Sequence, residues 1–147
     1  MGYVTDEDVE LRLGAATLVQ LTDDESSGVP NWLRVAEARV GAEGEVNGYL
    51  ARRVGVPVDV EAWPELAGLL RSITLDLVEY RLRGRRPPIP ADCVRRRAEA
   101  VQWLERVASG STVLPSMGAM DASPSAGVVG AVTGPPRVMT RDSLEAL

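Results

Sequence analysis

Apolar residues recur at intervals of three and four along two long segments of this chain, which is the period of an α-helix with one buried face. The clearer segment spans residues 63–84 and ends at a glycine that two arginines and two prolines follow, a common helix stop. A second segment spans about residues 90–109 and closes at Gly110. We expect the first to be the central core helix, since its stripe is the most regular: Trp63, Leu66, Leu70, Ile73, Leu77 and Tyr80.

The N-terminal third predicts shorter helical pieces and one longer helix. Thr5 and Asp8 have the spacing of a capping box, and the helix that they begin is expected to run to about Gly14. A further turn follows around residues 18–21, and a polar loop covers residues 22–29. The next helix is expected from Pro30 to about Arg53, with three internal glycines that suit a bend or close approach of another helix. Its expected apolar side is Trp32, Val35, Val40, Val46, Tyr49 and Leu50.

Four valines alternate with other residues between positions 54 and 60, and this period of two indicates an extended segment. Pro57 argues against a central strand, so we expect an exposed loop or edge strand that is free to meet a neighbouring subunit. Taken together, the patterns predict an all-α protein whose residues 1–110 form a small helical bundle of about four helices.

Residues 111–147 form a C-terminal arm rich in Gly, Pro and Ser. Such a segment buries too little apolar surface to offset about 1–2 kcal/mol of backbone entropy per residue, so we expect an extended arm ordered by partners. Val128, Val129 and Val132 lie in a segment suited to adding a strand to a partner's sheet edge. Leu144 and Leu147 lie in a segment expected to form a short terminal helix.

Composition argues against conventional catalysis. The chain has no histidine and one cysteine, Cys93, so it lacks an internal disulfide, the commonest general base and every Ser-His or Cys-His pair. A hydrolase that uses Asp76 and Glu79 is the weakest hypothesis, because this pair lacks a third partner and fits surface or interface polarity better. We expect Cys93 to be a small buried hydrophobe. We predict no enzyme and no cofactor.

Two further segments bear on metals and membranes. Residues 23–28 resemble the start of a calcium-binding loop, but its twelfth position, which requires a carboxylate, is Arg34. We therefore expect no metal and interpret this segment as a polar turn. Because no stretch has about 20 apolar residues and the acidic start lacks a leader-like pattern, we expect a soluble protein that is neither membrane-bound nor exported.

Charge is unevenly placed along a chain of net charge −5. The first 25 residues are strongly acidic, whereas seven arginines fall around the turn between the two long C-terminal helices. Three interpretations remain open: a solvated face, pairing with the acidic segment of a neighbouring subunit, and contact with DNA phosphates. We call this group the arginine corner, and it comprises Arg81, Arg83, Arg85, Arg86, Arg95, Arg96 and Arg97.

Several short segments occur in a recognisable order along the chain. Their residues are Tyr3, Thr5 to Asp8, Leu18, Gln20, Leu21, Thr22, Asp23, Val46, Gly48, Tyr49, Leu50, Asp76, Tyr80, Leu82, Gly84, Ala100, Trp103, Leu104 and Gly110. In this order they resemble the Mu-like prophage family of small head-tail joining proteins. The resemblance covers about Met1 to Leu114, and the chain departs from it in the long arm and in the three glycines of the segment from Pro30 to about Arg53.

This resemblance implies a structural adaptor at the neck of a tailed phage or phage-derived particle, assembled in the host cytoplasm. It implies a ring of copies, expected to be a dodecamer, that binds the portal protein and a downstream connector or tail terminator. Packaged DNA would pass through the ring without sequence-specific binding. The partner contacts that we predict are the arginine corner and the named valines and leucines of the arm. The alternative hypothesis is a small DNA-binding regulator that uses the arginine corner.

Overall fold

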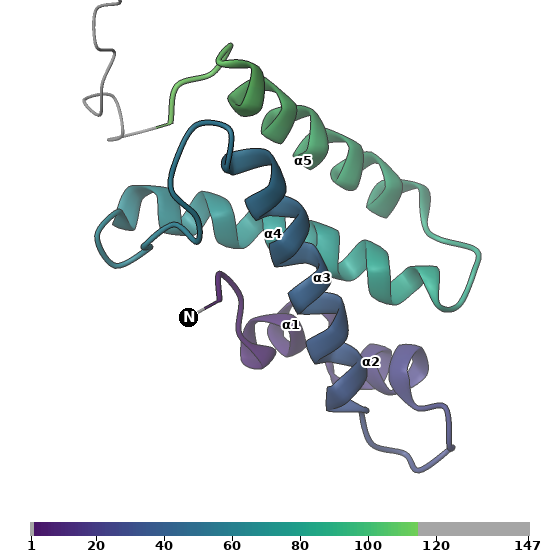
Figure 1. Cartoon of the computed structure of the whole chain (residues 1–147). Coiled ribbons are helices and arrows are strands. Elements are labelled where there is room, and N and C mark those ends of the chain that lie inside the picture. Colours follow the sequence, from purple (N-terminus) through teal and green to yellow (C-terminus); the bar gives the residue numbers. More distant parts are fainter. Residues whose placement is uncertain (1, 115–147) are drawn as a thin grey trace, which may run out of the picture.

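A computed structural model describes residues 2–114, and these residues form an all-helical bundle without a strand. Two short helices come first and three long ones follow (Figure 1). The all-α prediction is confirmed for the described residues, with five helices where about four were expected. Their bounds are α1 Asp6–Leu13, α2 Ala15–Thr22, α3 Trp32–Leu50, α4 Pro64–Gly84 and α5 Ala91–Ser109.

Helix α4 is the centre of the bundle, as its regular stripe predicted. It contacts each of the other four helices, with α3 crossing it on one side and α5 packed along it (Figure 1). Burial of each large aliphatic side chain stabilises the fold by about 1.5–3 kcal/mol, so a core of leucines and valines compensates for the few aromatic residues. The leucines that are most completely buried are Leu18, Leu50, Leu66, Leu70, Leu77, Leu82 and Leu104.

Local signals set the helix ends. The Thr5 hydroxyl accepts from the Asp8 backbone N–H at 3.1 Å while the Asp8 carboxylate accepts from Thr5, which confirms the capping box. Helix α3 begins at Trp32 because the Asn31 side chain caps its first turn, so the start predicted at Pro30 was two residues early. Helix α5 ends at Gly110, whose left-handed φ of 82° favours glycine.

The segment of alternating valines is a series of turns, and the prediction of an exposed loop or edge strand is wrong for its middle. Val58 is buried, and its N–H donates to the Tyr3 hydroxyl at 2.9 Å. That hydroxyl in turn donates to Asn47 at 2.6 Å. The N-terminal segment therefore covers Val58 within the same protomer.

Three apolar residues of the long helices are exposed, and two of them, Trp32 and Val40, were predicted on the apolar side of their helix. Trp32 and Val40 on α3 and Val94 on α5 are all exposed. On α3, the residues that are buried follow a different stripe, since Val40 lies about 200° around the helix from both Ala38 and Ala42.

The boundary between body and arm was predicted after residue 110, but the chain still packs on the helices at Leu114. Leu114 is buried against the core, whereas Val113 beside it is exposed. The body as described therefore includes residues 111–114. The arm contacts predicted at Val128, Val129, Val132, Leu144 and Leu147 lie outside the described residues.

Candidate partner-binding site

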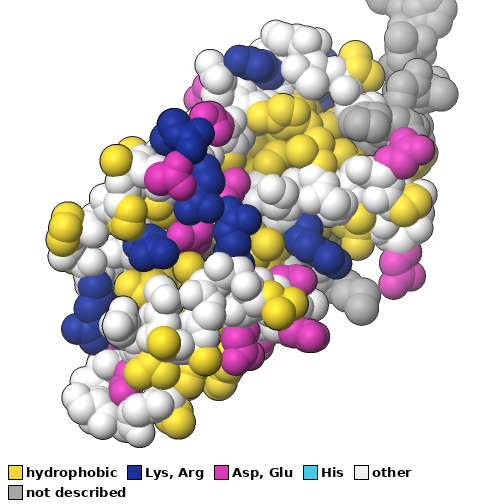
Figure 2. Space-filling model, turned by 180° about the vertical axis from the view of Figure 1, so that it is seen from behind, with side chains coloured by type: hydrophobic (Ala, Val, Ile, Leu, Met, Phe, Trp, Pro, Cys, Tyr) yellow, Lys and Arg dark blue, Asp and Glu magenta, His cyan; other side chains and the backbone are white. Residues whose placement is uncertain are grey.

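Every arginine of the arginine corner forms an ion pair within its own protomer. On the face seen in Figure 2, arginine side chains alternate with carboxylates instead of forming an uninterrupted basic area. The pairs are Arg81 and Arg97 with Glu45, Arg83 and Arg96 with Glu79, Arg85 and Arg86 with Asp24, and Arg95 with Asp92 and Glu99.

Glu79 is the most deeply buried carboxylate of these pairs, with 4% of the residue exposed. Its Oε1 accepts from Arg83 Nε at 2.8 Å, and its Oε2 accepts from Arg96 Nη2 at 3.0 Å and from Arg12 Nε at 3.4 Å. These arginines come from α4, α5 and α1, so one carboxylate joins three helices. We call this group the Glu79 hub.

Asp76 lies one turn before Glu79 and shares two of its arginines. Its Oδ1 accepts from Arg12 Nη2 at 2.5 Å and lies 3.8 Å from Arg96 Nη1. Burial raises the pKa of Asp76 above its usual value, even though both arginines act in the opposite direction. The prediction for Asp76 and Glu79 was surface or interface polarity, and a surface position is wrong for Glu79, because the residue is buried where three helices meet. Both carboxylates are engaged by guanidinium groups.

The arginine corner also meets the acidic N-terminal segment inside the protomer. Arg85 Nη2 donates to Asp24 at 2.5 Å, and its Nε donates to the Leu21 carbonyl at 3.0 Å. The hydrogen bond from Arg85 lowers the pKa of Asp24. Arg86 donates to the Asp23 carbonyl at 3.2 Å. This end of α4 is therefore tied to the end of α2, and contact of the arginine corner with a partner stays a prediction.

Arg81 of α4 and Arg97 of α5 both pair with Glu45 of α3. The guanidinium carbon of Arg97 lies 4.7 Å from the centre of the Tyr80 ring, a cation–π distance. Arg81 lies against Gly41, where an added Cβ would sit 2.9 Å from its Nη1. The neighbour of Gly41 is therefore the end of an arginine side chain, and the close approach of another helix predicted for the three glycines is not seen there. Cβ atoms at Gly44 and Gly48 would meet open space among the described residues.

Residues 23–28 form the polar turn that was predicted, and Cys93 is buried as predicted. The Asp23 carboxylate accepts from the Ser27 and Gly28 backbone N–H groups at 3.0 and 2.7 Å, and these bonds lower its pKa. The segment is therefore a closed polar turn, and residues 2–114 hold no group of metal-ligating side chains. Cys93 is buried, which raises the pKa of its thiol, as expected of a small hydrophobe.

Apolar side chains are exposed at several places on the bundle. Leu11 on α1 has 79% of its surface exposed, and Leu33 and Val40 line a shallow depression on the outer side of α3. That depression also includes Ala36 and the stem of Glu37. Val113 beyond α5 is 75% exposed. The sequence pattern assigned none of these residues to a contact surface.

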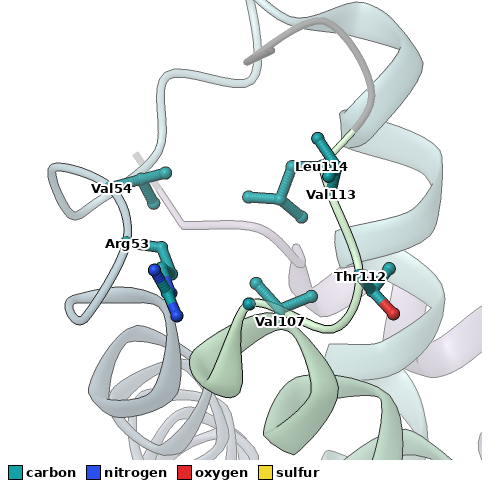
Figure 3. Close-up of a pocket in the computed structure, with 7 residues that line it drawn as sticks. Arg53, Val54, Val107, Thr112, Val113 and Leu114 are labelled. Atoms are coloured by element: carbon teal, nitrogen blue, oxygen red, sulfur yellow. The ribbon is translucent and has the colours of Figure 1, made fainter. Parts of the chain in front are cut away.

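A concave site lies where the chain after α3 meets the end of α5. Figure 3 shows Val54 on one side and Val113 and Leu114 on the other, with Val107 beneath them. The cavity has a volume of about 190 Å³. Its residues, which we call the terminal hollow, are Arg53, Val54, Val107, Gly110, Thr112, Val113 and Leu114.

Three arginines at this end of the bundle form no ion pair with a carboxylate of the described part of the chain. They are Arg52 and Arg53, just after α3, and Arg106, in the last turn of α5. Every other arginine of residues 2–114 pairs with a carboxylate of this range. Arg53 Nε donates to the Ala108 carbonyl at 3.2 Å, and its guanidinium lies against Gly110. Sequence reasoning missed this group because it has only three members and Arg106 lies far along the chain from Arg52 and Arg53.

Comparison with known proteins gives the family. None of the described helices is long and apolar enough to cross a membrane. No curated protein matches the chain. The model of a family described as Bacteriophage Mu, Gp36 matches residues 3–132, a range that includes all five helices and part of the arm. The match indicates a phage structural or morphogenesis protein that associates with the virion. The chain therefore belongs to the Bacteriophage Mu Gp36 family.

Proposed function

We propose that this protein is a head-tail adaptor of a tailed phage or phage-like particle. In this proposal, copies form a ring under the portal, extend the DNA channel and dock the next connector or tail component. The observation that carries it is the family match over residues 3–132, which makes the chain a phage structural or morphogenesis protein. The sequence resemblance to small head-tail joining proteins is the reason that we propose the adaptor role among such proteins.

The distribution of charge supports a scaffolding role. Buried and half-buried carboxylates such as Glu79 and Glu45 are satisfied by arginines of the same protomer. A protomer that satisfies its internal charges keeps its shape without a partner, and its exposed apolar side chains remain available for contact with neighbours. These features suit a small rigid unit that is built into a larger assembly.

The DNA-binding alternative has no specific observation in its favour. Arg85 and Arg86 would have to leave Asp24 before they met phosphates, and duplex binding then has to compensate for a lost ion pair. We also propose that the chain is not an enzyme, because the strongest carboxylate pair, Asp76 and Glu79, is occupied by arginines.

The test is to remove the coding sequence from the phage or prophage that carries it and to image the particles. We expect DNA-filled heads and unattached tails, with joining restored when the full chain is supplied. Purified chain should also cosediment with the tailless heads. Normal tailed particles from the deletion would exclude the adaptor role.

A truncation after Leu114 tests the arm separately. The five helices lie before this point, so we expect the helical circular dichroism signal to be retained. We expect the truncated chain to fail to join heads to tails. Unchanged joining by the truncated chain would leave the adaptor proposal intact and remove the arm from it.

A further inference from the structure

Helix α1 presents an apolar residue beside two carboxylates that have no described ion pair. Leu11, Glu7 and Glu10 share the outer face of the helix, because positions three and four apart lie on one side. All three are exposed, while Val9 on the other side packs into the core. Neither glutamate forms an ion pair with the described residues, although Asp6 and Asp8 nearby pair with Arg39 and Arg71. We call Leu11, Glu7 and Glu10 the acidic knob.

The terminal hollow has the complementary character. Its walls include three valines and a leucine, and Arg53 lines it. Arg52 and Arg106 are exposed and directly precede the lining residues Arg53 and Val107 in the chain, and none of the three arginines has a described carboxylate partner. Glu105 is next to Arg106 and is exposed, whereas the charged side chain that lines the hollow is that of Arg53. A hollow with apolar walls and a basic edge fits a single apolar side chain flanked by acidic ones.

The two surfaces do not meet within one protomer. Helix α1 contacts α2, α3 and α4 but makes no contact with α5 in the described residues. The C-terminal end of α1 is linked to the N-terminal half of α5 through Glu79 and Asp76 of α4, which both pair with Arg12 and Arg96. The terminal hollow lies at the opposite end of α5 (Figure 1).

We propose that the acidic knob of one copy binds in the terminal hollow of a second copy. Leu11 enters the apolar space, and Glu7 and Glu10 pair with the arginines around it. Because the two surfaces differ, the contact is heterologous, and repetition of it gives a closed ring or a filament. The inference rests on the adaptor function proposed above and names the contact that builds its ring. The arginines involved differ from the arginine corner predicted from the sequence.

Disulfide trapping tests the geometry. In the full-length chain, Leu11→Cys and Val113→Cys would be combined, since both positions are exposed and the native Cys93 is buried. Under mild oxidation we expect a ladder of covalent dimers, trimers and larger species. A matched control combines Leu33→Cys with Val113→Cys, because Leu33 is as exposed as Leu11 but lies on α3.

The expected yield of the ladder is about tenfold above that of the control and of each single-cysteine variant. A ladder of equal yield from the control pair would overturn the proposed contact. The contact would also be overturned if the single variant Leu11→Cys formed a covalent dimer, because that dimer would indicate a symmetric contact between two α1 helices. Absence of any crosslink over a wide range of protein concentration would overturn it as well.

Charge reversal tests the chemistry. Glu7→Arg with Glu10→Arg reverses the acidic knob, and Arg52→Glu with Arg106→Glu reverses the hollow; Arg53 is kept because it holds the Ala108 carbonyl. Each variant alone should self-associate at least about tenfold more weakly than the wild type in sedimentation velocity. An equimolar mixture should regain association, since each knob then faces a hollow of opposite charge.

The matched control reverses Glu61 and Glu65, two exposed carboxylates with no described ion pair, by the same total charge. It should associate as the wild type does. If the mixture fails to regain association, or if the control weakens association as much as the knob variant, the proposed contact is wrong.

The two proposals fail in different ways. If knob and hollow variants still join heads to tails and form the same assemblies, the copies contact elsewhere and the adaptor function stands. If residues 115–147 of the same copy fill the hollow, truncation after Leu114 will strengthen association and crosslinking. That result would show that the arm competes with the acidic knob for the terminal hollow. It would overturn the proposal that the knob of another copy fills the hollow in the full-length chain.

Discussion

Two groups of arginines in this molecule differ in what surrounds them. The seven of the arginine corner are dense in the sequence, and each meets a carboxylate of its own protomer. Arg53 lines an apolar hollow, and Arg52 and Arg106 directly precede lining residues of that hollow in the chain; none of the three has a described carboxylate partner. The contrast teaches that the density of charge along a chain is a poor guide to a binding surface, whereas the local balance of charge is a better one.

The largest test of the internally paired group is Glu79→Gln. Three arginines would then surround a neutral side chain, and loss of one partner of a buried ion pair typically costs about 3–5 kcal/mol. We expect the free energy of unfolding to fall by about 2–4 kcal/mol, because Arg12, Arg83 and Arg96 keep some contact with water. Urea denaturation followed by circular dichroism measures this loss.

The control for that change is Glu105→Gln, which removes an exposed carboxylate without a described ion pair. It should alter the free energy of unfolding by less than about 0.5 kcal/mol. An equal effect of the two substitutions would mean that the Glu79 hub contributes no more to stability than an exposed charge.

The direct comparison of the two groups uses paired double variants. Arg85→Ala with Arg86→Ala breaks the link from α4 to Asp24 and the Leu21 carbonyl, and we expect a loss of about 1–2 kcal/mol of unfolding free energy. Arg52→Ala with Arg106→Ala should leave stability within about 0.5 kcal/mol and weaken self-association instead. Thermal unfolding and sedimentation velocity separate the two results.

The same pair of variants addresses DNA. A regulator that reads DNA through the arginine corner would show salt-dependent duplex affinity that Arg85→Ala with Arg86→Ala abolishes. We expect the wild type and this variant to bind duplex DNA equally weakly, as measured by fluorescence anisotropy. A strong wild-type signal that the variant loses would restore the regulator hypothesis.

The three glycines of α3 differ in the space that surrounds them. The space beside Gly41 is filled by the Arg81 side chain, whereas no atom of the described residues lies within 4 Å of a Cβ added at Gly44 or Gly48. Gly44→Ala and Gly48→Ala should each stabilise the protomer by about 0.5–1 kcal/mol, because alanine has the higher helix propensity and meets no described atom. Gly41→Ala should gain less, since Arg81 has to move. Destabilisation by Gly44→Ala would indicate a neighbour of this face.

The smallest expected effect concerns pH. Arg85 holds the pKa of Asp24 below its reference value of 3.8, so the ionised form favours the folded state. The stability from Asp24 is present above the unfolded-state pKa and is lost as pH falls through the lowered folded-state pKa. Asp24→Asn should therefore be less stable than the wild type near pH 6, and the difference should vanish near about pH 2. A difference that grows on acidification would contradict this sign.

Periodicity predicted the long helices because their stripes are regular. The stripe that begins at Trp63 gave the position and centrality of α4, and the stop after Gly84 was placed correctly. The same reasoning failed for Val40, because α3 has apolar residues on more than one side and a periodic pattern cannot say which side has a partner. It failed for Val58 because a hydroxyl from Tyr3, 55 residues away in sequence, covers its backbone.

The candidate sites were predicted less well than the fold. The arginine corner was recognised as a group, but its carboxylate partners come from residues as distant as Asp24 and Glu45, and no local pattern pairs them. The terminal hollow was missed entirely, because Val54 and Leu114 become neighbours only when α3 and α5 end at the same place.

The sequence by itself determined the helical class, the capping of α1, the central position of α4 and the burial of Cys93. These features depend on residues within one or two helical turns, where spacing alone sets which side chains meet. Only the tertiary structure decided which charges are neutralised inside the protomer and which remain for a neighbour. That balance depends on distances between helices far apart in the chain, and it is fixed when the bundle packs.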